Sequence, residues 1–324
     1  MTRTRLLLFS SLSVVVAGAL VGLAAKGLDA TRPGLGPLPA AALVLPSDAT
    51  FVMGFDVKRL MSSPIYERME KSASMKPGAL QDLERVTGIL PGRDVSTIVV
   101  AGTSSSDATT LVFGQFDLVR IGAALDGGGT TKAAKSMVRG VPVYSGMMSK
   151  GKEETALALM DSGTLAMGSP ARIEALLAAR AERAEPFLGS GRIGAAVRGL
   201  RPGSTFWLVG DGSVTKNMSA AGGAMSLPLP PLETLVVTGD LTPDVSIRLT
   251  GKAMDEVAAK QTADMARTLI ALAAMQGGQR PELRALAAGL TVTSEGATVS
   301  LDARIPYELL DKLMPQASAA PQTR

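Results

Sequence analysis

The sequence predicts an α+β fold made of two similar antiparallel-sheet halves with helices packed on one face, preceded by an N-terminal membrane segment. Apolar and polar residues alternate along several short segments, as they do in half-buried strands. Short turns join most of these segments, which favours antiparallel pairing. The same order of segments occurs twice along the chain, which indicates an internal duplication.

The N-terminus has the features of a membrane-targeting segment. Arg3 and Arg5 precede a run from Leu6 to Ala25 that carries no charge, and twenty helical residues span about 30 Å, the thickness of a bilayer core. A cleaved signal peptide would use Ala17-Gly18-Ala19 or Gly22-Leu23-Ala24 as its small-residue site. An uncleaved signal-anchor would keep the whole span with its arginines in the cytoplasm, and the length of the run favours this reading.

Four pairs of segments carry the duplication. The pairs are TFVMGFDVKRLMS (50–62) with TFWLVGDGSVTKNMS (205–219) at an offset of 155, STIVVAG (96–102) with ETLVVTG (233–239) at 137, TTLVFGQFD (109–117) with VSIRLTGKA (245–253) at 136, and DSGTLAMGSPARIEALL (161–177) with SEGATVSLDARIPYELL (294–310) at 133 to 136. Three of these elements keep one order at nearly equal offsets, which chance alternation would rarely produce.

The predicted organisation follows from these matches. It comprises a signal-anchor or signal peptide (1–30), a Pro- and Gly-rich tether (31–46), a first α+β repeat (47–185), a connecting helix and loop (186–202), a second α+β repeat (203–316) and a disordered tail (317–324). The extra residues of the first repeat predict a helix, with Ser63 as its cap, Pro64 at its first position and Gly88 at its end. A long helix over 254–275 carries Val257, Ala258, Met265, Leu269 and Leu272 at helical spacing and should cover the second sheet.

The composition excludes several classes of function. The chain has no cysteine and no histidine, so it has no thiol nucleophile, no disulfide, no cysteine-type zinc site and no Ser-His-Asp triad. Its net charge is +4 with acidic and basic residues interspersed, and its aromatic content is 3%, so we expect no nucleic-acid partner. Acid–base chemistry near neutral pH would need retuned carboxylates, lysine or tyrosine.

Asp56, followed by Lys58 and Arg59, and Asp211 lie at equivalent places in the two repeats, where a strand ends and a helix is about to start. An aspartate at such a place accepts hydrogen bonds from the first N–H groups of the helix. Because a catalytic carboxylate would normally occur once, we interpret both as structural caps. For a carboxylate-based hydrolase, the candidates would be Asp56, Asp211 and Asp240.

Two kinds of short motif match nucleotide-binding or catalytic patterns but lack the surrounding features that those functions require. GSGRIG (189–194) fits G-x-G-x-x-G and has Asp211 at a suitable distance, but helical residues precede it, so a helix–helix loop with Ser190 as N-cap is the better interpretation. SVTK (213–216) and SKGK (149–152) have the spacing of serine acyl-enzymes without the Ser-Asp-Asn and Lys-Thr-Gly elements.

Neither a phosphate loop nor a copper site is supported. DGGGTTKAAK (126–135) lacks the second glycine directly before Lys-Ser/Thr, and it predicts a flexible turn into a strand over 131–138. The 16 methionines are scattered apart from Met147-Met148, which favours core filling over Cu(I) ligation. We therefore predict no catalytic, cofactor-binding or metal-binding residue and no cofactor.

Three stretches together resemble a group of signal-anchored bacterial envelope proteins that have no assigned activity. The stretches are LPSDATFVMGFDVKRLMSSPIYERM, VTGILPGRDVSTIVVAG and RPELRALAAGLTVTSEGATVSLDARIPYELL, and the resemblance spans roughly residues 45 to 314. It implies an exported, two-part α+β protein and transfers no functional residue.

The sequence thus predicts a non-enzymatic binding or scaffolding module of the cell envelope. It would be anchored in the inner membrane through its N-terminal helix, with the folded part in the periplasm or outside the cell and another envelope protein as partner. Two alternatives remain open, a carrier of an apolar, lipid-like ligand and a hydrolase built on carboxylates.

Overall fold

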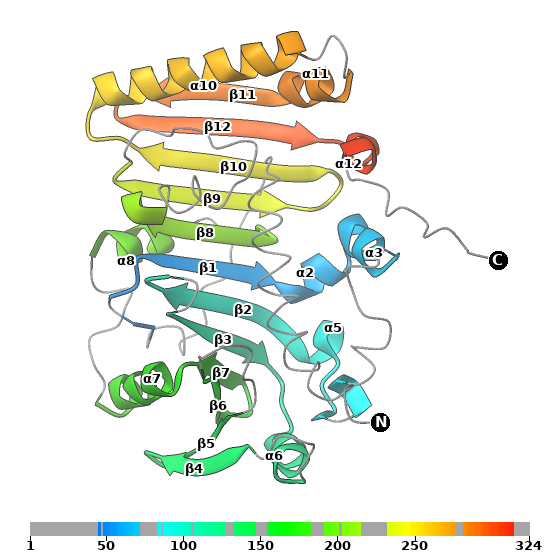
Figure 1. Ribbon diagram of the computed structural model, residues 1–324, viewed down its shortest axis with the longest axis vertical. Helices are drawn as coiled ribbons and strands as arrows, with labels where there is room; N and C mark the ends of the chain where they lie inside the picture. The colour runs from blue at the N-terminus through cyan, green and yellow to red at the C-terminus, as the bar shows by residue number, and fades with distance from the viewer. Residues whose placement is uncertain are drawn as a thin grey trace, which may run out of the picture.

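The computed structural model of the chain shows one large antiparallel sheet with helices around it (Figure 1). It describes residues 45–46, 48–71, 83–85, 87–104, 107–127, 133–146, 154–182, 191–200, 203–214, 232–276 and 281–313. The strands are β1 (Phe51–Asp56), β2 (Val95–Gly102), β3 (Ala108–Gly114), β4 (Ala134–Val138), β5 (Val141–Ser145), β6 (Ala156–Asp161), β7 (Thr164–Gly168), β8 (Phe206–Asp211), β9 (Thr234–Asp240), β10 (Val245–Lys252), β11 (Leu290–Glu295) and β12 (Thr298–Ile305). The helices are α2 (Val57–Met61), α3 (Pro64–Lys71), α5 (Pro91–Asp94), α6 (Leu118–Asp126), α7 (Pro170–Glu182), α8 (Gly191–Arg198), α10 (Glu256–Gln276), α11 (Pro281–Ala288) and α12 (Tyr307–Leu313).

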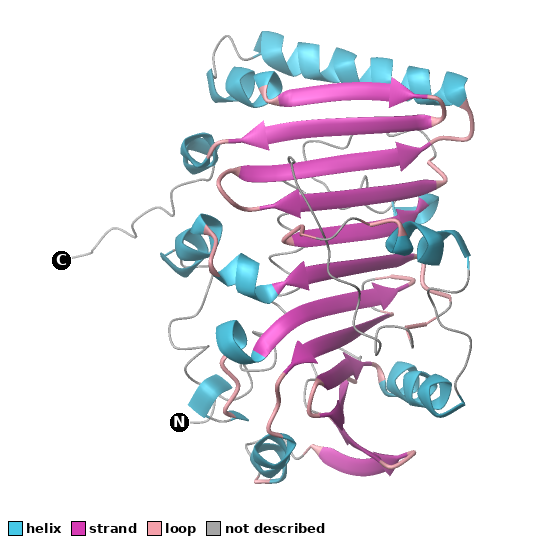
Figure 2. Cartoon of the chain, turned by 180° about the vertical axis from the view of Figure 1, so that it is seen from behind, coloured by secondary structure: helices cyan, strands magenta, loops and turns pink. Residues whose placement is uncertain are grey.

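The predicted α+β class with antiparallel strands is confirmed, and the strands of both repeats join in a single sheet. Among the described residues this sheet has twelve strands in the order β11-β12-β10-β9-β8-β1-β2-β3-β7-β6-β5-β4. Figure 2 shows the same strands from behind, side by side along the whole length of the molecule. Every neighbouring pair for which the register is defined runs antiparallel.

The strand order is mirrored about the β1–β8 pair. On one side it runs β1-β2-β3-β7-β6, and on the other β8-β9-β10-β12-β11. The registers agree as well, because Phe51 lies opposite Gly102 in the first set and Phe206 opposite Gly239 in the second. The sets differ between their third and fourth strands, where the first set inserts α6 and the β4–β5 hairpin and the second inserts α10 and α11.

One predicted offset needs correction. Gly102 lies opposite Ala108 and Gly239 opposite Ile247, so β3 and β10 correspond at an offset of 139 rather than 136. The connection between β9 and β10 is longer than that between β2 and β3. A turn that is two residues longer keeps the alternation between faces, so alternation does not reveal it, whereas the matched offset of 136 is three residues out of register and puts the β10 side chains on the wrong face.

The β1–β8 pair is held at both ends and on both faces. The Asp56 N–H donates to the Thr205 carbonyl at 2.8 Å, and the Asp211 N–H donates to the Thr50 carbonyl at 2.9 Å. On one face the buried Trp207 indole lies over Gly54, where a Cβ would come within 2.5 Å of the ring. On the other face the rings of Phe55 and Phe206 stack with their centroids 6.3 Å apart.

Helices cover both faces of the first repeat, so the prediction of helices on one face is wrong there. On one face Val99 and Leu111 pack with the buried side of α7 and α8, in a cluster that also holds Trp207. On the other face Ile98 and Val112 pack with α2 and α6. Neighbouring residues of a strand point to opposite faces. These strands are therefore apolar on both faces and need a cover on each.

In the second repeat, α10 covers one face of the sheet, and α8 covers only the β8–β9 part of the other face. Leu235 of β9 and Val299 of β12 pack against Ala259 and Ala263 of α10. The opposite face is hydroxyl-rich and charged, with Thr250 beside Ser300 and an ion pair between the side chains of Arg248 and Asp302. Figure 1 places α10 along β11 at the end of the sheet.

The predicted long helix is present, but two residues of its predicted apolar stripe are exposed. Val257 is 64% exposed and Leu272 is 49% exposed. The contacts with the sheet are made by Ala259 and Ala263, which allow the helix to sit close to the strands. Of the stripe that was expected to cover the second sheet, Ala258 packs against the sheet, Met265 and Leu269 are partly buried, and Val257 and Leu272 lie on the outside.

The extra residues of the first repeat agree in part with the prediction. Pro64 is the first residue of α3 as predicted, and Gly88 has a positive φ of 77° and closes a turn through its N–H to the Glu84 carbonyl at 2.7 Å. Ser63 directly precedes α3, and its hydroxyl donates to the Leu60 carbonyl at 2.6 Å.

Candidate functional site

Asp56 and Asp211 both occupy the structural place that the sequence predicts. Asp56 is the N-cap of α2, and its carboxylate accepts from the Arg59 N–H at 2.9 Å. Asp211 precedes the helical residues 212–214, and its carboxylate accepts from the Ser213 N–H at 2.8 Å and from the Ser213 hydroxyl at 2.5 Å. The two capping interactions are therefore confirmed, and each satisfies N–H groups that a helix start leaves free.

The two aspartates do not share a cleft. β1 and β8 run antiparallel, so the end of β1 lies beside Thr205 and the end of β8 lies beside Thr50. Asp56 and Asp211 are consequently at opposite ends of the strand pair. A two-carboxylate mechanism needs both groups within reach of one substrate, and this arrangement separates them.

Asp240, the third hydrolase candidate, is joined to Asp56 through Arg59. The Arg59 guanidinium lies 3.5 Å from Asp240 and 3.7 Å from Asp56, and it also donates to the Gly203 carbonyl. Asp240 accepts from the Thr205 N–H at 3.1 Å and from the Thr205 hydroxyl at 3.0 Å, and its side chain is only 14% exposed. These contacts tie α2 of the first repeat to the β8–β9 end of the second, which is a structural use of the carboxylate.

The strongest electrostatic cluster lies around Arg172 in α7. Its guanidinium donates to Asp107 through Nε at 2.7 Å and through a second nitrogen, and to Asp48 at 2.9 Å. The hydrogen bonds from Arg172, followed by that from the Thr103 hydroxyl, hold the pKa of Asp107 well below its usual range. Asp107 in turn raises the pKa of Arg172. The cluster fixes α7 against the β2–β3 turn and the segment before β1.

The other candidate motifs gain no support from the described residues. In GSGRIG, Gly191 opens α8, and the preceding described element is the helix α7 rather than a strand. The strand after the glycine run comprises Ala134–Val138, shorter than the predicted 131–138. Ser190, SKGK (149–152), Lys216 of SVTK and Met147-Met148 lie outside the described residues. Within the described ranges, no three Asp or Glu side chains cluster closely enough to hold a metal ion.

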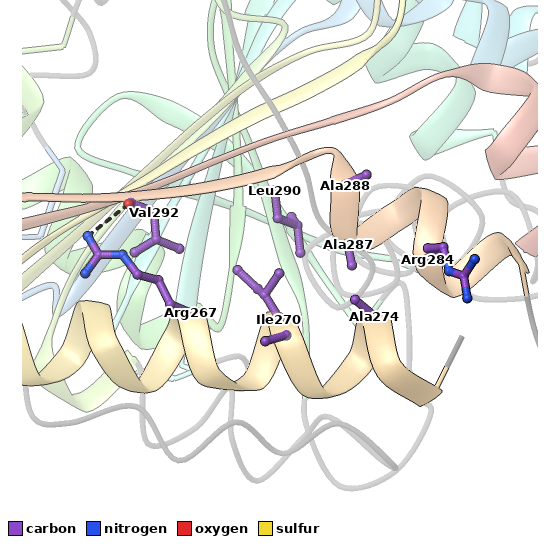
Figure 3. Close-up of a pocket in the computed structure, with 9 residues that line it drawn as sticks. Arg267, Ile270, Ala274, Arg284, Ala287, Ala288, Leu290 and Val292 are labelled. Carbon is purple, nitrogen blue, oxygen red and sulfur yellow. Dashed lines mark hydrogen bonds between the residues drawn. The ribbon is translucent and has the colours of Figure 1, made fainter. Parts of the chain in front are cut away.

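A groove of about 300 Å³ lies between α10, α11 and β11 (Figure 3). Alanines on both helices leave the space open, while Ile270, Leu290 and Val292 supply larger apolar side chains. The lining residues are Arg267, Ile270, Ala271, Ala274, Arg284, Ala287, Ala288, Leu290 and Val292. This volume is at the lower end of the range of small-molecule sites, about 300–1,000 Å³.

Two arginines supply the charge of the groove, and they differ in their partners. Arg267 forms an ion pair with Asp264 at 2.7 Å and donates to the Val292 carbonyl at 3.1 Å. Arg284 is exposed and forms no hydrogen bond or ion pair with the other described residues. Figure 3 shows the two guanidinium groups toward opposite ends of the groove with apolar side chains between them.

The outer side of α10 and the residues just before it carry exposed apolar side chains. Met254 is 74% exposed and Met275 is 79% exposed, in addition to Val257 and Leu272. We call these four residues the outer face of α10. A group of exposed apolar side chains on one element is typical of an interaction surface.

The groove was missed at the level of sequence. The alanine-rich segments that line it, ALAA (271–274) and ALAA (285–288), are typical of ordinary helices. The groove forms only because α11 and β11 pack against α10 with these small side chains between them. No local pattern encodes that docking.

The fold defines the chain as an α+β protein with one large antiparallel sheet, and known structures contain a related arrangement. No family model matches the chain, and no curated protein matches it. It is similar to the crystal structure of TP0453 in crystal form I, with a TM-score of 0.50 and 12% sequence identity over 88% of this chain and 96% of that one. This likeness concerns the fold alone.

The predicted membrane segment, 6–25, lies outside the described residues. In the part of the chain that the structure describes, no helix is both long and apolar enough to cross a membrane.

We predict that Asp56→Ala and Asp211→Ala each lower the free energy of unfolding by about 1 kcal/mol, the usual contribution of an N-cap. Asp56→Asn is the matched control, because asparagine caps as well as aspartate and should leave stability nearly unchanged. Urea unfolding followed by Trp207 fluorescence measures the effect. Loss of an activity with unchanged stability would contradict the capping role.

We also predict a pH-dependent contribution from Asp107. Because its pKa is depressed in the folded state, its stabilising effect is complete above the unfolded-state pKa of about 3.9 and is lost as the pH falls through the folded-state value. Asp107→Asn should therefore be less stable than the wild type at pH 7. The difference should narrow below about pH 4. Urea unfolding over a pH series tests this, and a difference independent of pH would contradict it.

Proposed function

We propose that the chain is a non-enzymatic binding or scaffolding module of the bacterial cell envelope, tethered to the inner membrane by its N-terminal segment. The folded part would lie in the periplasm or outside the cell. It would present a surface to another envelope protein.

The observation that carries this proposal is the outer face of α10. Its four apolar side chains are between 49% and 79% exposed, and they lie at the end of the sheet where α10 runs along β11. Exposed apolar side chains gathered on one element favour a protein-binding surface, because association removes them from water.

The three candidate carboxylates already form hydrogen bonds or ion pairs within the protein, which supports a non-enzymatic function. Asp56 and Asp211 cap the segments that follow them, and Asp240 is held by Arg59 and Thr205. A general acid or nucleophile needs an oxygen within hydrogen-bonding reach of a substrate. A hydrolase built on these residues would have to break the two caps or the Arg59–Asp240 contact that links the two repeats.

The apolar-ligand carrier is the second candidate, and the groove between α10, α11 and β11 favours it. The groove and the outer face of α10 are formed by different side chains of one helix. A carrier that also docks on a partner would use both.

We predict that the double variant Leu272→Glu, Met275→Glu loses its envelope partner while remaining folded, because exposed positions tolerate polar residues at a cost within roughly 0.5 kcal/mol. Val119→Glu is the matched control, because Val119 is 84% exposed on α6. The measurement is photo-crosslinking in intact cells from a reactive residue at Val257, followed by identification of the crosslinked protein. A partner crosslinked equally well by the double variant would contradict the proposal.

A further inference from the structure

We infer that the groove between α10, α11 and β11 binds an amphiphile with a single apolar chain and an anionic head group, and that Arg284 pairs with the head group. This inference concerns the groove side of α10 rather than its outer face. It deepens the second candidate function, the apolar-ligand carrier, on which it rests, and it does not depend on the proposed protein-binding role.

The walls of the groove fit a flexible apolar chain. Ala274 of α10 points toward Ala287 of α11, and Ile270 of α10 points toward Leu290 of β11. Ala271 and Ala288 also line the groove. The lining side chains other than the two arginines are all aliphatic. They offer no side-chain hydrogen bond to a sugar and no aromatic face to a base, so burial of apolar surface must supply the binding energy.

The charges of the groove favour an anion at one end. Arg267 already has a counter-ion in Asp264 and a second acceptor in the Val292 carbonyl. Arg284 has no such partner among the described residues, so its guanidinium can pair with an incoming carboxylate or phosphate, which matches its planar donor geometry. An apolar trough that ends at a guanidinium with no ion-pair partner among the described residues complements a molecule with an apolar chain and an anionic head.

The size of the groove limits the ligand to one chain. A volume of about 300 Å³ is small for a ligand site. A free fatty acid and a single-chain phospholipid share the required chemistry, and they differ in whether the head is a carboxylate or a phosphate. The experiment distinguishes these two sources.

The test is photo-labelling of the full chain in lipid nanodiscs with a fatty acid that carries a diazirine in its chain. Labelled peptides are mapped by mass spectrometry. We expect the label to concentrate in residues 267–276 and 281–292. A probe with the same chain and a trimethylammonium head should label these segments roughly tenfold less, because it repels Arg284. Oleate and lysophosphatidate are added as competitors, and the stronger one identifies the natural class of head group.

Three variants make the test specific. Arg284→Gln should reduce labelling roughly tenfold, the effect of losing one charge-assisted pair. Ala274→Phe should abolish labelling by filling the groove. Arg198→Gln removes an equal charge from the end of α8 and should change nothing.

Several results would overturn the inference. These are labelling spread evenly over the protein, equal labelling by the cationic probe, labelling unaffected by Arg284→Gln, and labelling that neither competitor displaces. Both groove variants retain Leu272 and Met275. Loss of groove labelling with partner crosslinking intact therefore supports the site independently of the proposed function. Groove labelling in the absence of any partner would leave the groove assignment standing and reject only the protein-binding role.

Discussion

The antiparallel pairing of β1 with β8 is the contact on which the rest of the structure depends. Trp207 lies over Gly54 on one face of this pair, and Phe55 stacks with Phe206 on the other. The side chain of Trp207 occupies the space that any Cβ at residue 54 would need. Glycine is thus required opposite tryptophan, and the pair fixes the register from which both sets of strands extend.

The two repeats share a framework and differ in what is inserted into it. The shared positions have structural uses, as the caps Asp56 and Asp211 and the reciprocal hydrogen bonds at the ends of β1 and β8 illustrate. The groove and the outer face of α10 lie in the insertion of the second repeat, where the first repeat has α6 and the β4–β5 hairpin. Both proposed binding surfaces therefore lie in the insertion that distinguishes the second set of strands from the first.

The sequence predicted those features that depend on local chemistry. Alternation identified the strands of both repeats, and the recurrence of Asp56 and Asp211 identified two helix caps. The arrangement of the repeats in one continuous sheet could not be predicted, because the pairing of β1 with β8 joins residues far apart in the sequence. For the same reason the cover of the first repeat on both faces and the hollow beside Ala274 emerged only from packing.

The position of α10 shows why the sequence can predict where a helix lies without predicting which of its faces is buried. Its larger apolar residues, including Val257 and Leu272, predicted the buried side. The residues buried against the sheet are Ala259 and Ala263, with Ala258 as the one member of the predicted stripe beside them, because small side chains permit close approach. Hydrophobic periodicity counts apolar residues and does not weigh how closely two elements can pack.

Native-state hydrogen exchange at the β1–β8 pair tests the central claim most directly. The amides of Asp56 and Asp211, which bond across the pair, should exchange only through global unfolding and should have the same free energy of opening as the most protected amides of β2 and β9. This result would show that the two repeats unfold as one unit across the pair. Exchange of Asp56 and Asp211 at a clearly lower free energy, with β2 and β9 still protected, would show that the repeats separate at this contact and would contradict the account.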